Sequence, residues 1–129
     1  MRIFKYPWFA RFASKEGIQD SELREIVNTV LEPGQADADL GGGVYKVRIA
    51  RPGEGKSGAY RVIAFFRSRE RTIFHYGFAK SAQSNISRGD LKVMKKQAKK
   101  YLAYSDEQMN KQVANGVLLE ITRGEEYAG

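Results

Sequence analysis

Three cationic side chains have a spacing that would let them act together on a phosphate. Lys46 and Arg48 alternate within residues 44–50, a β-branched run that predicts a strand, so their side chains share one face. Arg61 lies early in a second such run, residues 59–67, and comes near the first two if these strands pair. A lysine that is partly desolvated among other cations has a lowered pKa and can act as a base, while arginine stays charged and stabilises a phosphate.

RNA is the substrate on which such a cluster could act without a metal ion. Its 2′-hydroxyl is an internal nucleophile, so a base and charge-stabilising groups could be sufficient for cleavage. On composition alone, the simpler alternative is that the cations only position phosphates and catalyse nothing. A further alternative is that the basic surface only docks an acidic partner.

Several other chemistries are excluded or disfavoured by composition. The chain has no cysteine and one histidine, which rules out disulfides, cysteine-built metal sites and a two-histidine ribonuclease. Residues 41–80 contain only two acids, Glu54 and Glu70, so we expect no metal site there and no cofactor. His75 stands between Phe74 and Tyr76, and we expect it to be a hydrogen-bonded histidine of the sheet.

One stretch matches a nucleotide-binding motif in its sequence, but the element predicted after it does not fit that motif. Residues 50–57 read A-R-P-G-E-G-K-S, which fits the permissive phosphate-loop pattern. A phosphate loop must lead into a helix whose N-terminal amides hold the phosphates, whereas a strand-like run follows here. We therefore interpret residues 51–58 as a connection between strands, with Lys56 at its tip.

The charge of the chain is concentrated in its middle. Residues 41–80 contain nine basic side chains and two acidic ones, an excess equal to the net charge of +7 of all 129 residues. A local excess of one sign attracts a polyanion, and nucleic acid is the common one. No apolar run approaches the roughly 18 residues of a membrane span, and residues 1–10 lack a secretory pattern, so we expect a cytoplasmic protein.

The elements that must position these residues follow from periodicity and capping signals. We expect a short strand at residues 2–6, a helix from Pro7 to Gly17, and a helix capped by Asp20 or Ser21 that ends at Pro33. A polar linker, 35–43, would lead into three strands at 44–50, 59–67 and 72–79. A helix over 90–104 capped by Ser87, a continuation to residue 114 capped by Ser105, and a strand over 117–121 complete the chain.

Clustered strands predict an α+β fold with a mostly antiparallel sheet. We expect one domain over residues 1–129, with the helices packed on one side of the sheet. On the helix at 90–104, an apolar stripe adjoins an arc of five lysines: Lys92, Lys95, Lys96, Lys99 and Lys100. The arc is either a solvated face or a phosphate contact. Taken over the whole chain, the candidate RNA-binding residues are Arg51, Tyr60, Tyr76, Lys92, Lys96 and Lys99.

Three segments together resemble a known family. Y-K-V-R-I-A-R-P-G-E-G-K-S-G-A-Y-R-V-I, F-H-Y-G-F-A-K-S and N-I-S, in this order, resemble the RelE superfamily of bacterial toxins and its HigB-like branch. The resemblance covers roughly residues 9–121. It implies a small α+β endoribonuclease that cuts mRNA on the ribosome. It also implies a cognate antitoxin, commonly with a helix-turn-helix domain.

The resemblance also implies site residues. The family's basic positions correspond to Lys46, Arg48, Lys56, Arg61 and Lys80. We expect Lys46 or Lys56 to act as base and the two arginines to stabilise charge. The family's tyrosine after the last basic position is replaced here by Ser81, Ser84, Asn85 and Ser87, and Ala59 replaces a glycine. The general acid therefore stays open, and Tyr60 or Tyr76 could stack on the substrate base or belong to the core.

Overall fold

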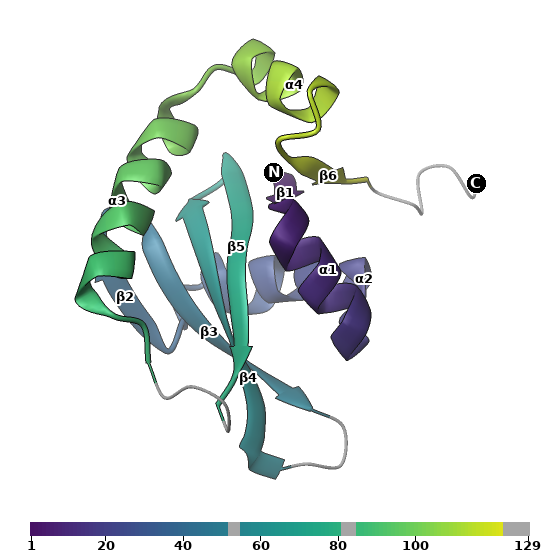
Figure 1. Cartoon of the computed structure of the whole chain (residues 1–129), viewed down its shortest axis with the longest axis vertical. Helices are drawn as coiled ribbons and strands as arrows, with labels where there is room; N and C mark the ends of the chain where they lie inside the picture. The colour runs from purple at the N-terminus through teal and green to yellow at the C-terminus, as the bar shows by residue number, and fades with distance from the viewer. Residues whose placement is uncertain (52–54, 81–84, 123–129) are drawn as a thin grey trace.

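The computed structural model describes residues 1–51, 55–80 and 85–122 (Figure 1). Its elements, in chain order, are β1 (Arg2–Lys5), α1 (Pro7–Glu16), α2 (Asp20–Ile26), the π-helical turn η1 (Val27–Leu31), β2 (Ala38–Gly41), β3 (Val44–Arg51), β4 (Gly55–Arg67), β5 (Arg71–Ala79), α3 (Arg88–Ala103), α4 (Asp106–Ala114) and β6 (Leu119–Ile121).

The strands form one six-stranded sheet in the order β2-β3-β4-β5-β1-β6. Neighbours are antiparallel except β1 and β5, which pair in parallel. The elements from α1 to β4 provide the long connection that parallel pairing requires. The predicted α+β fold with a mostly antiparallel sheet is confirmed.

Helices cover both faces of this sheet, which corrects the expectation that they pack on one side. Along β4, Val62, Ala64 and Phe66 pack in the cluster that contains α1 and α2. Ile63 and Phe65 point the other way, into the cluster that contains α3 and α4. Figure 1 shows α3 on one side of the strands and α1 with α2 on the other. The cause is the continuous apolar run V-I-A-F-F, which makes both faces of β4 apolar, so that both require a cover.

Most helix ends follow the local signals. Pro7 occupies the first turn of α1, and Gly17 ends the helix in the left-handed conformation, at φ 74°. Ser87 accepts a hydrogen bond from the Asp90 N–H at the start of α3, and Ser105 accepts one from Gln108 at the start of α4. The N-cap of α2 is Gln19 rather than Asp20 or Ser21, because Glu22 accepts a hydrogen bond from the Gln19 N–H at 3.4 Å.

Two connections are shorter than expected. The polar linker at 35–43 contains the edge strand β2, which pairs with β3 from Ala38–Lys46 to Gly41–Val44. The next connection shortens because β4 begins at Gly55, which pairs with Arg51. Since a strand and not a helix follows the A-R-P-G-E-G-K-S stretch, the rejection of a phosphate loop is confirmed.

Candidate nucleic-acid interface

Pairing between β3 and β4 brings three predicted site residues together. Arg48 lies directly opposite Arg61, and Lys46 lies two residues along β3, opposite Ile63. Because Ile63 packs on the α3 side, all three side chains point to that face of the sheet. We call Lys46, Arg48 and Arg61 the basic face. Directly opposed residues have Cβ atoms about 5 Å apart, and like charges at this distance repel, so an anion between them would relieve the repulsion.

The environment of the Arg61 side chain favours binding of an anion. Its Nη1 atom is buried and has no hydrogen-bond partner among the described residues. A desolvated donor without a partner costs roughly 1–3 kcal/mol, which a phosphate oxygen would offset. Arg48 is exposed and Lys46 is half-buried. No ion pair involves either residue within the described ranges.

The remaining predicted basic residues are only partly described. Lys80 is exposed, and its N–H donates to the Ala59 carbonyl at 3.2 Å, so β5 and β4 stay paired up to this residue. The strand alternation continued past Phe78 places Lys80 on the side of the basic face. The side chains of Arg51 and Lys56, and residues Ser81 and Ser84, lie outside the described part of the chain.

Tyr60 does not fit a role in stacking on RNA. Its side chain is on the opposite face of the sheet, 4% exposed, in the cluster with α1 and α2. The ring meets Phe12 edge-on, and the hydroxyl donates to the carboxylate of Glu16. Of the two open readings of this tyrosine, the core one is correct.

Tyr76 lies on the same side as the basic face, and its ring contacts an aromatic residue of α1 that the sequence did not single out. Tyr76 pairs with Ile63, and Trp8 from α1 stacks on it with ring centroids 4.6 Å apart and planes at 22°. Trp8 is 42% exposed, which is unusual for so large an apolar ring. The available signal was its position, one residue before Phe9 and therefore off the apolar stripe of the helix.

The geometry is that of a sheet face on which cations adjoin exposed aromatic surface. Phe78, the pairing partner of Arg61, lies 5.9 Å from Tyr76 between ring centroids, so the basic face and the Trp8–Tyr76 pair are neighbours. Across residues 1–51, 55–80 and 85–122, no three His, Asp or Glu side chains are arranged to hold a metal ion. None of the helices in these ranges has the length and hydropathy that spanning a bilayer requires.

Comparison with protein families identifies the group to which this fold belongs. Residues 1–121 match the family described as RelE toxin of the RelE / RelB toxin-antitoxin system. The chain belongs to the RelE toxin family. A search of curated proteins gave no match. Family membership makes this protein a toxin of a toxin–antitoxin system and implies an antitoxin as its partner.

The single histidine of this RelE-family toxin is a structural residue, as expected. His75 Nε2 lies 2.9 Å from Gln97 Oε1, and the ring packs 4.3 Å from the Tyr6 ring and 4.9 Å from the Phe65 ring. Burial lowers the pKa of His75, and the hydrogen bond to Gln97 opposes this shift only in part. Burial also raises the pKa of the neighbouring Tyr6 phenol.

The buried histidine predicts a loss of stability in mild acid. Because the folded-state pKa lies below the ordinary value of 6.5, the unfolded chain takes up a proton first as pH falls through that value. We expect the toxin to lose more free energy of unfolding than a His75→Gln variant between about pH 7.5 and about pH 5.5. Urea titrations at both pH values measure this difference. Equal losses in the two proteins would show that His75 does not titrate differently on folding.

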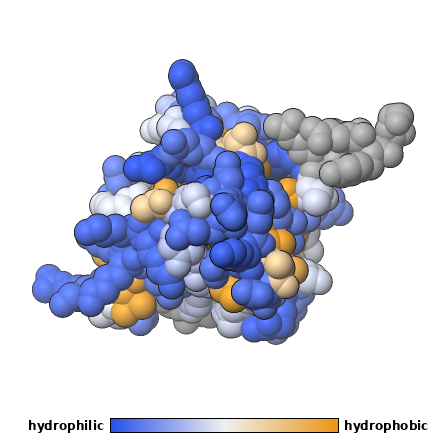
Figure 2. All heavy atoms as spheres, turned by 90° about the horizontal axis from the view of Figure 1, so that it is seen from above, coloured by the Kyte–Doolittle hydropathy of each residue, from blue (hydrophilic) through white to orange (hydrophobic). Residues whose placement is uncertain are grey.

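The five lysines of α3 lie where the helical pattern placed them. Lys92, Lys95, Lys96, Lys99 and Lys100 are exposed, while Met94, Ala98 and Tyr101 are buried against the sheet. The end of the molecule that carries α4 is also hydrophilic, and hydrophobic side chains on it occur only in small separate patches (Figure 2). The contact of Lys92, Lys96 and Lys99 with RNA stays a prediction.

Proposed function

We propose that this toxin is a metal-independent endoribonuclease that cleaves mRNA in the cytoplasm, on the ribosome. The observation that carries the proposal is the opposition of Arg48 and Arg61 on one face with Lys46, where the buried Arg61 Nη1 has no partner among the residues that the structure describes. The quoted K-x-R and G-K-S-G motifs lead us to place it near the HigB-like branch, whose antitoxins commonly carry a helix-turn-helix domain.

The proposed reaction is an internal transfer of a phosphoryl group. The 2′-oxygen of the RNA attacks the adjacent phosphorus while the bond from phosphorus to the 5′-oxygen breaks, giving a 2′,3′-cyclic phosphate and a 5′-hydroxyl end. Lys46 or Lys56 accepts the proton of the 2′-hydroxyl. Arg48 and Arg61 stabilise the charge that builds on the phosphate oxygens. Lys80 is also one of the proposed catalytic residues. The residue that donates a proton to the leaving 5′-oxygen is unassigned.

Mapping RNA ends tests the reaction directly. RNA from cells that express the toxin should carry new 2′,3′-cyclic phosphate and 5′-hydroxyl ends, and purified toxin that has been treated with EDTA and then desalted should produce the same ends when it is added to ribosomes. Loss of cleavage on chelation would contradict the metal-free mechanism. New 5′-phosphate ends would contradict attack by the 2′-hydroxyl.

A second candidate is a non-catalytic module that binds RNA or the ribosome. The observation that favours it is the absence of a tyrosine from the residues directly after Lys80, 81–88, where the described residues Asn85 and Ser87 bond to the backbone: Asn85 accepts from the Ile86 N–H, and Ser87 caps α3. This alternative predicts salt-dependent RNA binding with intact ends after long incubation. A protein that only docks an acidic partner would have no affinity for RNA.

The exposed ring of Trp8 is proposed as a stacking surface for a base of the bound RNA. Stacking of a base on an aromatic ring contributes about 1–3 kcal/mol, so Trp8→Ala should weaken RNA binding about tenfold or more. Trp8→Phe, which keeps a ring, should lose much less. Fluorescence anisotropy with a labelled oligonucleotide measures the Kd, and Val93→Ala, at another exposed apolar residue, is the matched control. Equal Kd values for the wild type and Trp8→Ala would remove Trp8 from the interface.

A further inference from the structure

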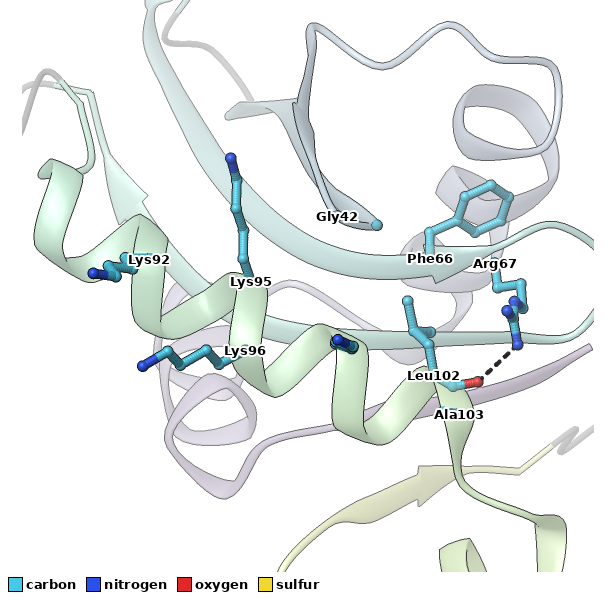
Figure 3. Close-up of a pocket in the computed structure, with 10 residues that line it drawn as sticks. Gly42, Phe66, Arg67, Lys92, Lys95, Lys96, Leu102 and Ala103 are labelled. Carbon is cyan, nitrogen blue, oxygen red and sulfur yellow. Dashed lines mark hydrogen bonds between the residues drawn. The ribbon is translucent and has the colours of Figure 1, made fainter.

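A groove lies between α3 and the turn that joins β2 to β3. It has a volume of about 630 Å³ and is lined by Gly42, Gly43, Phe66, Arg67, Lys92, Lys95, Lys96, Lys99, Leu102 and Ala103 (Figure 3). We call it the α3 groove. Its position distinguishes it from the basic face. Arg48 is four residues beyond Val44, where β3 leaves the turn, which is about 13 Å along an extended strand, and Lys46, two residues beyond Val44, is the member of the basic face nearest to the turn along β3.

The floor of the groove is apolar, and it lies where the turn packs closely on α3. Gly43 has φ 84°, and a Cβ atom on it would lie 2.6 Å from Leu102 Cδ1, so a side chain here would be strained and would collide with Leu102. Arg67 fixes one wall by donating to the Leu102 carbonyl at 3.1 Å and pairing with Glu70 at 3.2 Å. The bare backbone of the turn and the side chains of Leu102 and Ala103 thus form a concave apolar surface.

The rim of the groove carries positive charge without local compensation. Lys92, Lys95, Lys96 and Lys99 are exposed, and none has an ion-pair partner among the described residues. No acidic residue is among the described residues that line the groove. Lys95 extends from α3 across the gap toward the turn, while Lys92 and Lys96 project outward from the helix (Figure 3). A ligand that fills this groove must therefore combine apolar groups with negative charge.

A protein segment fits these properties better than RNA does. RNA binding uses phosphate contacts together with aromatic surfaces for its bases. Among the described residues that line the groove, the only aromatic one is Phe66, which is buried in the sheet. A protein segment could place leucine-like side chains on the floor of the groove and carboxylates against the lysines of its rim, and so fill the whole groove. The partner that family membership implies is an antitoxin.

We propose that the α3 groove is the docking site for a segment of the cognate antitoxin in which apolar side chains are flanked by Asp or Glu. The proposal rests on the toxin–antitoxin role of the protein and not on the ribonuclease reaction. It predicts fast, salt-sensitive association, because the unpaired lysines attract the acidic segment before the apolar contacts form.

Two pairs of variants separate apolar docking from general attraction of charge. Ala103→Gln places a longer neutral side chain in the groove, and Ala114→Gln makes the same change at the exposed last residue of α4. Lys92→Glu, Lys96→Glu and Lys99→Glu combined reverse three rim charges. The combination Arg11→Glu, Lys15→Glu and Lys111→Glu changes the net charge equally at exposed sites outside the groove.

The probe is the purified product of the reading frame adjacent to the toxin's own, with its binding followed by surface plasmon resonance. We expect at least tenfold weaker binding for Ala103→Gln and for the rim triple, the latter mainly through a slower association rate with a reduced salt dependence. Both controls should bind like the wild type. RNA cleavage by the wild-type toxin alone is measured in parallel, so the ribonuclease proposal can fail while the groove assignment stands.

The following results would overturn the proposal. If both triples weaken binding equally, only general attraction of charge is at work. If Ala103→Gln binds normally, the floor is not occupied. If the rim triple loses RNA binding and keeps antitoxin binding, the lysines serve RNA. Loss of binding only on the Arg11, Lys15 and Lys111 changes would place the antitoxin elsewhere, and the absence of any binding by the wild type would contradict docking of this partner on the toxin.

Discussion

Replacing Arg61 by alanine is expected to lower RNA cleavage by about 10²–10³-fold, because a buried donor aimed at the developing charge is lost. Its Nη1 atom has no protein partner to compensate in the described structure, so the group is already desolvated before substrate binds. Arg61→Lys keeps the charge but not the planar fork and should recover only part of the rate. Growth inhibition in cells should fall in the same order.

The stability of the Arg61→Ala variant is expected to stay within about 1 kcal/mol of the wild type, because the change also removes repulsion from Arg48. Circular dichroism and urea unfolding check this point. Arg11→Ala, at an exposed site on α1, is the control for loss of one positive charge. Wild-type cleavage by a folded Arg61→Ala protein would remove Arg61 from the mechanism.

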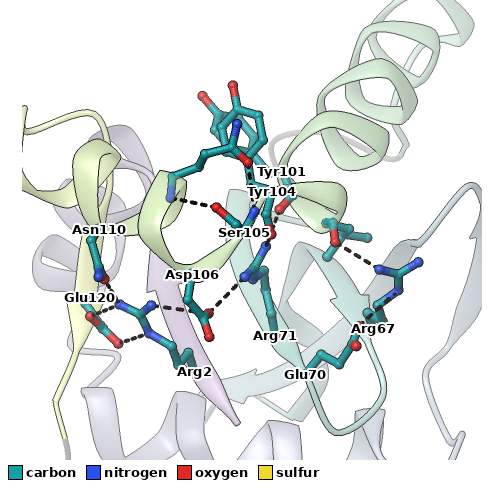
Figure 4. Close-up of polar contacts among 12 residues, drawn as sticks. Arg2, Arg67, Glu70, Arg71, Tyr101, Tyr104, Ser105, Asp106, Asn110 and Glu120 are labelled. Carbon is teal, nitrogen blue, oxygen red and sulfur yellow. Dashed lines mark hydrogen bonds and ion pairs between the residues drawn. The ribbon is translucent and has the colours of Figure 1, made fainter.

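Replacing Arg71 by alanine is expected to lower the free energy of unfolding by about 3 kcal/mol. The Arg71 side chain is 8% exposed and joins three parts of the chain (Figure 4). Its Nη1 donates to the Tyr101 and Tyr104 carbonyls, both at 2.7 Å, and its Nη2 pairs with Asp106 at 3.1 Å. These contacts hold the end of α3 and the start of α4 on β5, and alanine leaves the carbonyls without their donor.

A neighbouring arginine is the matched control for Arg71. Arg67 also donates to a carbonyl of α3 and pairs with Glu70, but its side chain is 56% exposed (Figure 4). Water replaces contacts of this kind, so Arg67→Ala should cost less than about 1 kcal/mol. Urea unfolding measures both variants. A loss for Arg71→Ala no larger than that for Arg67→Ala would contradict the role of Arg71.

The sequence by itself determined the features that depend on neighbours along the chain. Pro7, Gly17, Ser87 and Ser105 mark helix ends through bonds that close within a turn or two, and the structure has these ends as predicted. The common face of Lys46 and Arg48 follows from the period of two in a strand. The sequence placed Arg61 near Lys46 and Arg48 only if the two strands pair. The β3–β4 register shows that they do.

The tertiary structure alone decided the features that depend on distant partners. The four residues of β2 are a strand because β3 offers them hydrogen bonds, not because A-D-L-G favours extended backbone. A register shift in β5 leaves His75 between the pairs Ala64–Phe74 and Ile63–Tyr76. Such a bulge inverts the alternation after it, so Tyr76 faces the side of the basic residues while Phe74 faces α1. The residues next to Tyr60 and Tyr76 do not show which ring is buried, and only the pairing of whole strands separates the core tyrosine from the one beside the site.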